Sequence, residues 1–421
     1  MKKTVQQVLM MTAAILLIAS QYACNNGTSA NTASTDAATA EKKDTVHCIN
    51  PASRAGLMAR TGSGDTGQLA IGQAKNIHYA IDTSNWPAKP WPAGMVWVPG
   101  GEYAMGGVGS EARQDEFPVH RVKVDGFWMD QTEVTVLEFK KFVKATGYVT
   151  VAEKKPEWNQ LKLQLPPNTP KPDDASLVPG SLVFTPTSGP VPLDDYSRWW
   201  RYVPQANWKH PLGPTSDVYG TSNYDNHPVT QVCWFDVEAY CKWAHKRLPT
   251  EAEWEFASRG GLEGKAYSWG DEKPSASNVK ANLWQGNFPN ENKQIDGYVY
   301  TAPVKSYAPN GYGLYDIIGN VWEWCSDWYR PDTYTKEKGA GLVVNPAGPS
   351  DSYDPDEPYA TKRVVRGGSY LCNEQYCSSY RPSARMKTDP YSGESHTGFR
   401  AVMTQAQWLG LQKQKQSMAA K

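Results

Sequence analysis

The sequence predicts a mixed α+β fold in which short strands and helices are joined by much irregular loop structure. Its 35 Gly and 31 Pro favour turns, and its 17 Trp and 23 Tyr favour aromatic packing in a globular body. Alternating apolar residues indicate strands near the start of that body, and capping signals indicate short helices after them. We therefore expect little regular secondary structure.

Length and charge bound the class of protein. The 421 residues could form one large or two medium domains. The formal net charge is +0, so the chain lacks the basic surface that nucleic-acid binding requires. We expect no nucleic-acid partner.

The first residues resemble an export signal. Lys2 and Lys3 precede an apolar run over 8–19, which is too short for a stable membrane span but typical of a signal peptide. Ala23 and Cys24 suggest lipoprotein processing, although Gln21 replaces the usual aliphatic residue. We expect a signal peptide over 1–23 and a lipid anchor on Cys24. The protein would be exported to the periplasm or outer membrane, and only the lipid anchor would attach it to a membrane. The alternative is ordinary cleavage nearby that releases a soluble protein.

Residues 24–90 carry few large apolar side chains, so they cannot bury enough surface to offset chain entropy. We interpret them as a tether, in which Cys48 has no favoured partner. The globular body is expected over 91–403, followed by a polar tail over 404–421 that could form a short surface helix.

Strand signals open the body. Residues 91–101 alternate in polarity and end in a Gly pair, which predicts a strand and a tight turn; Val122, Val124 and Phe127 are expected in a second strand. Residues 156–224 are rich in Pro and aromatic residues without a sustained period, and we expect a long ordered loop there.

Three helices have recognisable starts. Thr135 with Glu138, and Thr250 with Glu253, form capping boxes, and glycines at 147 and 260–261 end these two helices. Asp236 is expected to cap the third. Its apolar residues at helical spacing are Val237, Tyr240, Cys241 and Ala244, which makes Cys241 a packed structural thiol rather than a reactive one.

Cys372 and Cys377 stand close together behind a Gly-Gly-Ser turn, whereas the other cysteines are scattered singly. Such a pair can be a disulfide, a redox couple or a site for a soft metal, and spacing alone leaves these open. Ser369 lacks the G-x-S-x-G elbow of a hydrolase. The seven histidines show no ligand spacing, so each is expected at the surface or in a hydrogen bond.

Many ordered segments together resemble the formylglycine-generating enzymes, also called sulfatase-modifying factors. The resemblance covers about 91–403 and is carried by residues 101–106, 129–134, 146–154, 206–211, 227–229, 246–255, 281–286, 301–304, 310–315, 319–324, 366–369 and 398–400. It implies the fold of that family, which is similar to C-type lectins.

The resemblance also implies an activity. Members convert a cysteine in a Cys-x-Pro-x-Arg segment of a sulfatase to formylglycine with O₂, so an unfolded or nascent sulfatase would be the partner of a monomeric enzyme. Cys372 and Cys377 would hold Cu(I), since two thiolates suit a soft ion. Ser369 would hydrogen-bond a reacting sulfur or oxygen, Trp322 would exclude water, and the substrate pocket would also contain Tyr376 and Arg381.

Two structural Ca²⁺ ions are implied as well, because family ligand positions match hard oxygen donors here. The first set is Asn282, the carbonyl of Leu283, Asp296 and the carbonyl of Tyr298; the second is Asp316, the carbonyls of Gly319 and Val321, and Glu323. Without the resemblance these acids would be interpreted as solvated loop residues.

The chain departs from the family pattern in several places. Asn373 and Ser379 replace a histidine and an arginine, which would affect substrate binding or oxygen handling. Two family disulfides cannot form, because Cys241 would face Ala401 and the other pair of positions holds Ser258 and Pro382; Cys233 and Cys325 are expected as buried free thiols. The alternative hypotheses are a non-enzymatic envelope lipoprotein that uses this fold as a binding or assembly module, and a copper or redox site for another substrate.

Overall fold

The computed structural model describes residues 82–218 and 220–419. The expected signal peptide, the anchor at Cys24, Cys48 and the tether up to residue 81 lie outside the described residues. Within the described ranges, no helix combines the length and the apolar character that a membrane span requires.

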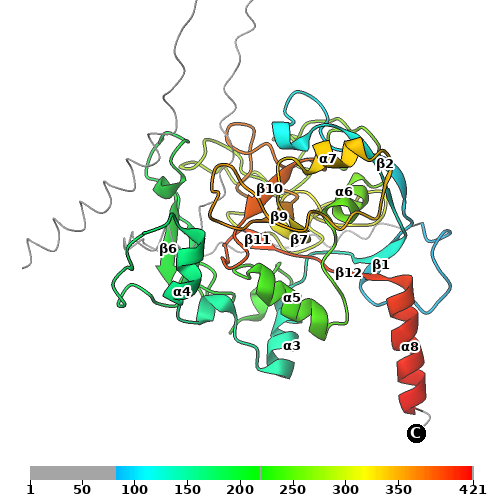
Figure 1. The fold of residues 1–421 in the computed structure, drawn as a ribbon, viewed down its shortest axis with the longest axis horizontal. Coiled ribbons are helices and arrows are strands. Elements are labelled where there is room, and N and C mark those ends of the chain that lie inside the picture. The colour runs from blue at the N-terminus through cyan, green and yellow to red at the C-terminus, as the bar shows by residue number, and fades with distance from the viewer. Residues whose placement is uncertain (1–81, 219, 420–421) are drawn as a thin grey trace, which may run out of the picture. The chain divides into compact units, whose positions relative to one another are not determined.

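The described elements are short, as the composition predicted, and regular structure is interrupted by long loops (Figure 1). The strands are β1 (Met95–Val98), β2 (Gly101–Met105), β3 (His120–Val124), β4 (Phe127–Asp130), β5 (Gly180–Phe184), β6 (Trp200–Pro204), β7 (Trp322–Trp328), β8 (Val343–Val344), β9 (Arg363–Arg366), β10 (Arg385–Thr388), β11 (Thr397–Gly398) and β12 (Val402–Thr404). The helices are α3 (Val136–Thr146), α4 (Trp158–Leu161), α5 (Trp234–Trp243), α6 (Glu251–Arg259), α7 (Thr333–Gly339) and α8 (Gln405–Ala419). The predicted mixed fold is confirmed.

The sheet that carries the site has the strand order β10-β9-β7-β11 and lies in the middle of Figure 1. β9 pairs antiparallel with β7 and β10, while β11 pairs parallel with β7. Three smaller sheets surround it, with orders β1-β4-β12, β2-β3-β8 and β5-β6. Because β9 and β10 are antiparallel neighbours, the loop between them begins and ends at the same end of the strands.

Both predicted capping boxes are present. Thr135 Oγ1 accepts from the backbone N–H of Glu138, whose carboxylate accepts from the N–H of Thr135 at 2.8 Å. Thr250 and Glu253 repeat this arrangement at α6. Left-handed glycines end both helices, because a residue without Cβ adopts positive φ at little cost.

Two local predictions were wrong. Helix α5 begins at Trp234 with Cys233 as its cap, and Asp236 is the acid of the first turn that accepts the Cys233 N–H at 3.0 Å. Phe127 starts a separate strand, β4, which pairs with β1 and β12, whereas β3 pairs with β2 and β8. A Cβ at Gly126 would lie 2.3 Å from the Trp97 ring, so the link between β3 and β4 needs glycine.

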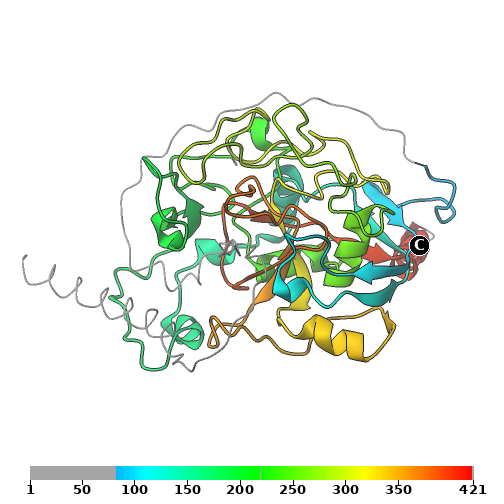
Figure 2. The same cartoon turned by 90° about the horizontal axis from the view of Figure 1, so that it is seen from above.

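The expected long loop over 156–224 contains an antiparallel pair, β5 and β6. All five residues of β5 are buried, so its sequence does not alternate and gave no strand period. By contrast, the stretch between α6 and β7 has no helix or strand, and Figure 2 shows it as long yellow-green loops. The C-terminal α8 has no buried residue, which confirms the expected surface helix.

Candidate active site

Cys372 and Cys377 lie in the loop that joins β9 to β10. This loop leaves β9 through Gly367 and Gly368, whose φ values are +97° and +76°. A Cβ at Gly367 would lie 3.1 Å from the Ile317 carbonyl oxygen. The turn therefore depends on glycine, and Ser369 and both cysteines follow it in the loop.

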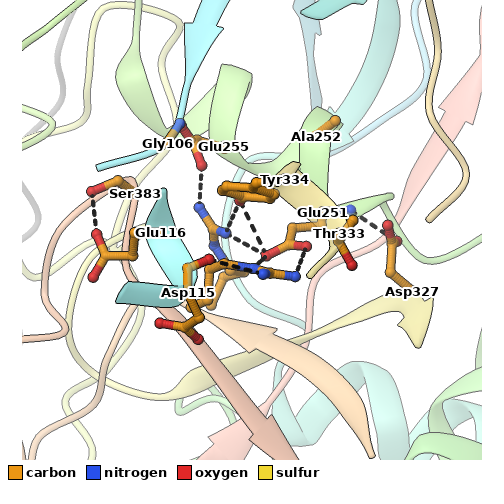
Figure 3. Close-up of polar contacts among 12 residues, drawn as sticks. Gly106, Asp115, Glu116, Glu251, Ala252, Glu255, Asp327, Thr333, Tyr334 and Ser383 are labelled. Atoms are coloured by element: carbon orange, nitrogen blue, oxygen red, sulfur yellow. Dashed lines mark hydrogen bonds and ion pairs between the residues drawn. The ribbon is translucent and has the colours of Figure 1, made fainter. Parts of the chain in front are cut away.

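A buried charge network holds both ends of this cysteine loop. Arg366 donates to Glu251 at 2.6 Å and to Glu255 at 2.5 Å, and Arg385 donates to both oxygens of Glu251 at 2.6 and 2.8 Å. Figure 3 shows Glu251, Glu255 and the Tyr334 ring gathered in this region. Burial raises the pKa of Glu251, but the two guanidinium groups outweigh burial and hold it below its ordinary value.

The loop and the sheet enclose a small cavity of about 10 Å³, close to the least space that one water molecule needs. Its walls are mostly aromatic or soft side chains: Trp200, Phe288, Trp322, Ser369, Leu371, Cys372, Tyr376, Cys377, Met386 and His396. The structure therefore brings together five predicted site residues, Cys372, Cys377, Ser369, Trp322 and Tyr376. Among the residues that the structure describes, no Lys, Arg, Asp or Glu lines this cavity.

Hydrogen bonds connect the polar groups of the cavity. The Ser369 N–H donates to Cys372 Sγ at 3.4 Å, and Ser369 Oγ lies 3.1 Å from His396 Nδ1. His396 Nε2 lies 3.2 Å from a carboxylate oxygen of Glu394. Sequence reasoning missed His396 and Glu394. The signal available was the position of His396 directly before the Thr-Gly-Phe-Arg segment that carries the resemblance.

A larger groove of about 330 Å³ lies beside the cavity. Its lining includes Cys372, Asn373, Glu374 and Gln375 from the cysteine loop, and residues of the loops after α6 form the other wall. Cys372 lines both the groove and the cavity. A peptide lying in the groove would therefore meet the cavity at this thiol.

Comparison with known proteins places the chain in a family. Residues 83–405 match the family described as FGE-sulfatase, the sulfatase-modifying factor enzyme 1-like domain. The chain belongs to the sulfatase-modifying factor family. A Streptomyces coelicolor protein named formylglycine-generating enzyme is 44% identical over 75% of this chain and 93% of its own length. A Thermomonospora curvata protein of the same name is 43% identical over 73% and 93%.

A mouse protein named inactive C-alpha-formylglycine-generating enzyme 2 is 35% identical over 73% of this chain and 87% of its own length. Membership of the sulfatase-modifying factor family therefore does not by itself establish catalysis.

Arg381, which was predicted in the substrate pocket, lines neither the cavity nor the groove. Its guanidinium binds both carboxylate oxygens of Glu116 at 2.7 and 2.8 Å and is 2% exposed. Ser383 also donates to Glu116. Arg381 thus anchors the far end of the cysteine loop to the buried carboxylate of Glu116.

The two residues that were expected to depart from the family pattern make local contacts. Asn373 lines the groove, where its side chain donates to the Gly286 carbonyl at 3.2 Å and accepts from the N–H of Tyr376 at 2.9 Å. Ser379 is buried and accepts from Arg113 at 3.4 Å. Asn373 therefore fixes the turn between the two cysteines.

All five described cysteines are buried thiols: Cys233, Cys241, Cys325, Cys372 and Cys377. The prediction of buried thiols at Cys233 and Cys325 is confirmed. Burial raises the pKa of both, as well as that of Cys241, so these three are poor nucleophiles.

The predicted residues of the first Ca²⁺ set lie together. The Asp296 carboxylate accepts from the backbone N–H groups of Tyr298 at 3.0 Å and Leu283 at 3.3 Å. The Asn282 amide nitrogen donates to the carbonyl of Tyr300 at 2.8 Å. Burial raises the pKa of Asp296 to about 6, so a bound cation would favour its charged form.

The second set contains a carboxylate oxygen without a partner. Asp316 Oδ1 is buried and makes no hydrogen bond, and the same is true of Glu133 Oε2. Burial, followed by the charge of Asp316, raises the pKa of Glu133 well above its ordinary value. Burial raises the pKa of Asp316 to about 7. Such an oxygen fits a cation ligand, whereas the Glu323 carboxylate is already held by Arg400 and Trp254.

Within residues 82–218 and 220–419, no three His, Cys, Asp or Glu side chains lie close enough to hold a metal by themselves. A Ca²⁺ ion at either set would consequently need carbonyl or amide oxygens as well. A copper ion at the cavity would have two thiolates as its protein ligands.

Proposed function

We propose that this chain converts a cysteine in the Cys-x-Pro-x-Arg segment of sulfatases to formylglycine with molecular oxygen. The observation that carries the proposal is the enclosure of two buried thiols, Cys372 and Cys377, with Ser369 and Trp322 around one cavity beside a groove. The relatives named formylglycine-generating enzyme support it.

The proposed reaction balances with an external thiol reductant. Conversion of CH₂SH to CHO with release of H₂S gives up two electrons, and reduction of O₂ to water takes four. A reducing thiol pair would supply the other two electrons and become a disulfide. The products are the aldehyde, H₂S, the disulfide and one water molecule. The two oxygen atoms are accounted for by the aldehyde and the water.

The donor set of the cavity fits Cu(I), because Cys372 and Cys377 offer soft sulfur ligands and Met386 adds a thioether to the wall. Bound copper would supply the one-electron chemistry by which O₂ reacts with a thiol. The rings of Trp322, Trp200 and Phe288 would exclude bulk water from this chemistry.

The groove would bind the extended substrate segment, so that its cysteine reaches Cys372 at the cavity mouth. Tyr376 stacks on Phe288 with ring centroids 4.4 Å apart and would fix the wall near the substrate. Ca²⁺ ions at the Asp296 and Asp316 positions would order the loops between α6 and β7, which have no helix or strand to hold them. The proposal also includes export directed by residues 1–23 and lipidation of Cys24. The partner would be a nascent sulfatase, and the enzyme would be a monomer.

Mass spectrometry tests the proposal. A Cys-x-Pro-x-Arg peptide would be incubated aerobically with the Cu(I)-loaded protein and a thiol reductant, in parallel with the Cys377→Ala variant and with a Ser-x-Pro-x-Arg peptide. We expect the mass loss of CH₂SH becoming CHO only with the intact pair and the cysteine peptide. No change would favour the non-enzymatic binding module, or another substrate if the protein still binds Cu(I) tightly.

A further inference from the structure

A continuous line of buried hydrogen bonds runs from the cavity into the protein. Ser369 Oγ lies 3.1 Å from Nδ1 of His396, and Nε2 of His396 lies 3.2 Å from Oε2 of Glu394. Ser369 and Glu394 are both 0% exposed, and His396 is 6% exposed. Bulk water therefore cannot compete for these bonds, and their donors and acceptors must match.

The acceptor at the inner end is fixed first. Glu394 accepts from the Thr388 hydroxyl at 2.7 Å and from the Thr397 hydroxyl at 2.8 Å, in addition to its contact with His396. Both carboxylate oxygens of Glu394 are thus engaged, one with Thr388 and the other with Thr397 and His396. An ionised carboxylate only accepts, so Nε2 of His396 must carry a proton.

The direction of the remaining bonds follows. If the imidazole is neutral with its proton on Nε2, Nδ1 is an acceptor and the Ser369 hydroxyl donates its proton to Nδ1. Ser369 Oγ also accepts the N–H of Leu371 at 3.2 Å. The hydroxyl hydrogen is thus used inside the protein, and the oxygen keeps one lone pair for the cavity that it lines with both cysteines.

We propose that His396, oriented by Glu394, is a positioning residue that makes the Ser369 hydroxyl a hydrogen-bond acceptor for the S–H of a thiol in the cavity. The substrate thiol is identified by the proposed function, on which this part of the inference rests. The polarity of the Ser369 hydroxyl does not depend on it.

The ring of His396 is well held for this role. It packs edge to face against Trp200 with ring centroids 4.8 Å apart, and its carbonyl accepts from the N–H of Trp322 at 2.9 Å. Directly after it, Thr397 and Gly398 form β11 alongside β7. Contacts with Trp200 and Trp322, which both line the cavity, therefore fix the position of the imidazole.

A Ser–His–carboxylate line also occurs in hydrolases, but the geometry here differs from a nucleophilic site. Ser369 is fully buried, and the sequence around it lacks the G-x-S-x-G elbow that exposes a nucleophilic serine. The hydroxyl is therefore a polar part of the cavity wall rather than an attacking group.

The first test measures the tautomer of His396 in the whole wild-type protein. The protein contains only seven histidines, so ¹⁵N-histidine labelling gives few signals, and the spectrum of His396→Asn assigns the one that disappears. We expect Nε2 protonated and Nδ1 bare. A protonated Nδ1, alone or in an imidazolium, would overturn the inference, because Ser369 could not then donate to His396. This result is independent of turnover.

The second test separates hydrogen bonding from ring packing. His396→Phe keeps an aromatic ring beside Trp200 but removes both nitrogens, whereas His396→Asn restores an acceptor near the Nδ1 position. We expect kcat on the cysteine peptide to fall about 10- to 100-fold in His396→Phe, with little change in KM, and to recover partly in His396→Asn.

The matched control for the second test is His227→Phe, another buried histidine that contacts Thr301 and lines neither the cavity nor the groove. It should leave kcat unchanged. Equal kcat for His396→Phe and wild type would contradict the positioning role even if the tautomer is as expected. If wild type itself shows no turnover, the proposed function fails while the tautomer still decides the polarity of Ser369.

Discussion

Arg366 and Arg385 are direct register partners on β9 and β10, and both bind the single carboxylate of Glu251. They stand at the two ends of the loop that carries Cys372 and Cys377. Glu251 is on α6, so one helix position fixes both ends of the cysteine loop. The distance between those ends, and with it the shape of the cavity, depends on a buried acid that does not touch the cavity.

Replacing this acid should destabilise the protein strongly. In Glu251→Gln, two buried guanidinium groups lose their shared counter-charge, and we expect the free energy of unfolding to fall by about 3–5 kcal/mol in urea titrations. The control is Glu263→Gln, whose ion pair with Arg121 is exposed and should contribute less than about 1 kcal/mol. Similar losses in the two variants would contradict the role of Glu251 in holding both ends of the cysteine loop.

The two cysteines of the cavity should matter for chemistry more than for folding. We expect Cys372→Ala and Cys377→Ala each to abolish turnover and tight Cu(I) binding, while the melting temperature changes little because only one small side chain is lost. Cys241→Ala removes a buried thiol outside the cavity and should keep turnover at a cost of about 1 kcal/mol. A large fall in melting temperature for either cavity variant would point to a structural role instead.

Calcium should stabilise the protein through Asp316. With ion at about 100 times its dissociation constant, binding would add about 2.7 kcal/mol to the free energy of unfolding, measured as the difference between CaCl₂ and chelator. Asp316→Asn should lose most of this increment. Asp327→Asn is the matched control, because Asp327 is equally buried but accepts from Glu251 N–H and Ser326 instead. An unchanged calcium response in Asp316→Asn would exclude this ion site.

Asp327 should also give stability a measurable pH dependence. Burial, followed by the nearby charge of Glu251, raises its pKa from 3.8 to about 7. Between these values the folded state keeps a proton that the unfolded chain has released, so the contribution of Asp327 to stability falls as pH rises from about 4 to about 7. Relative to wild type, Asp327→Asn should therefore gain stability across this range in urea titrations. A difference that does not vary with pH would mean that Asp327 has an ordinary pKa.

Local signals in the sequence predicted the elements that local physics controls. The capping boxes at Thr135 and Thr250 located α3 and α6, because the cap, the first-turn acid and the terminal glycine all lie within one short segment. The same logic failed at Asp236, since a carboxylate at the third helical position and one at the cap give similar patterns. β5 was missed because a strand buried on both faces does not alternate, and β6, whose burial does alternate, was missed together with its partner.

By itself, the sequence determined the mixed fold, the resemblance to the sulfatase-modifying factors, and the importance of Cys372, Cys377 and Ser369. Only the tertiary structure decided that His396 and Glu394 stand behind Ser369 and that Arg381 is held by Glu116 away from the cavity. Hydrogen-bond partners far apart in the chain are set by the packing of whole elements. No local pattern records which of two buried groups an arginine or a histidine will reach.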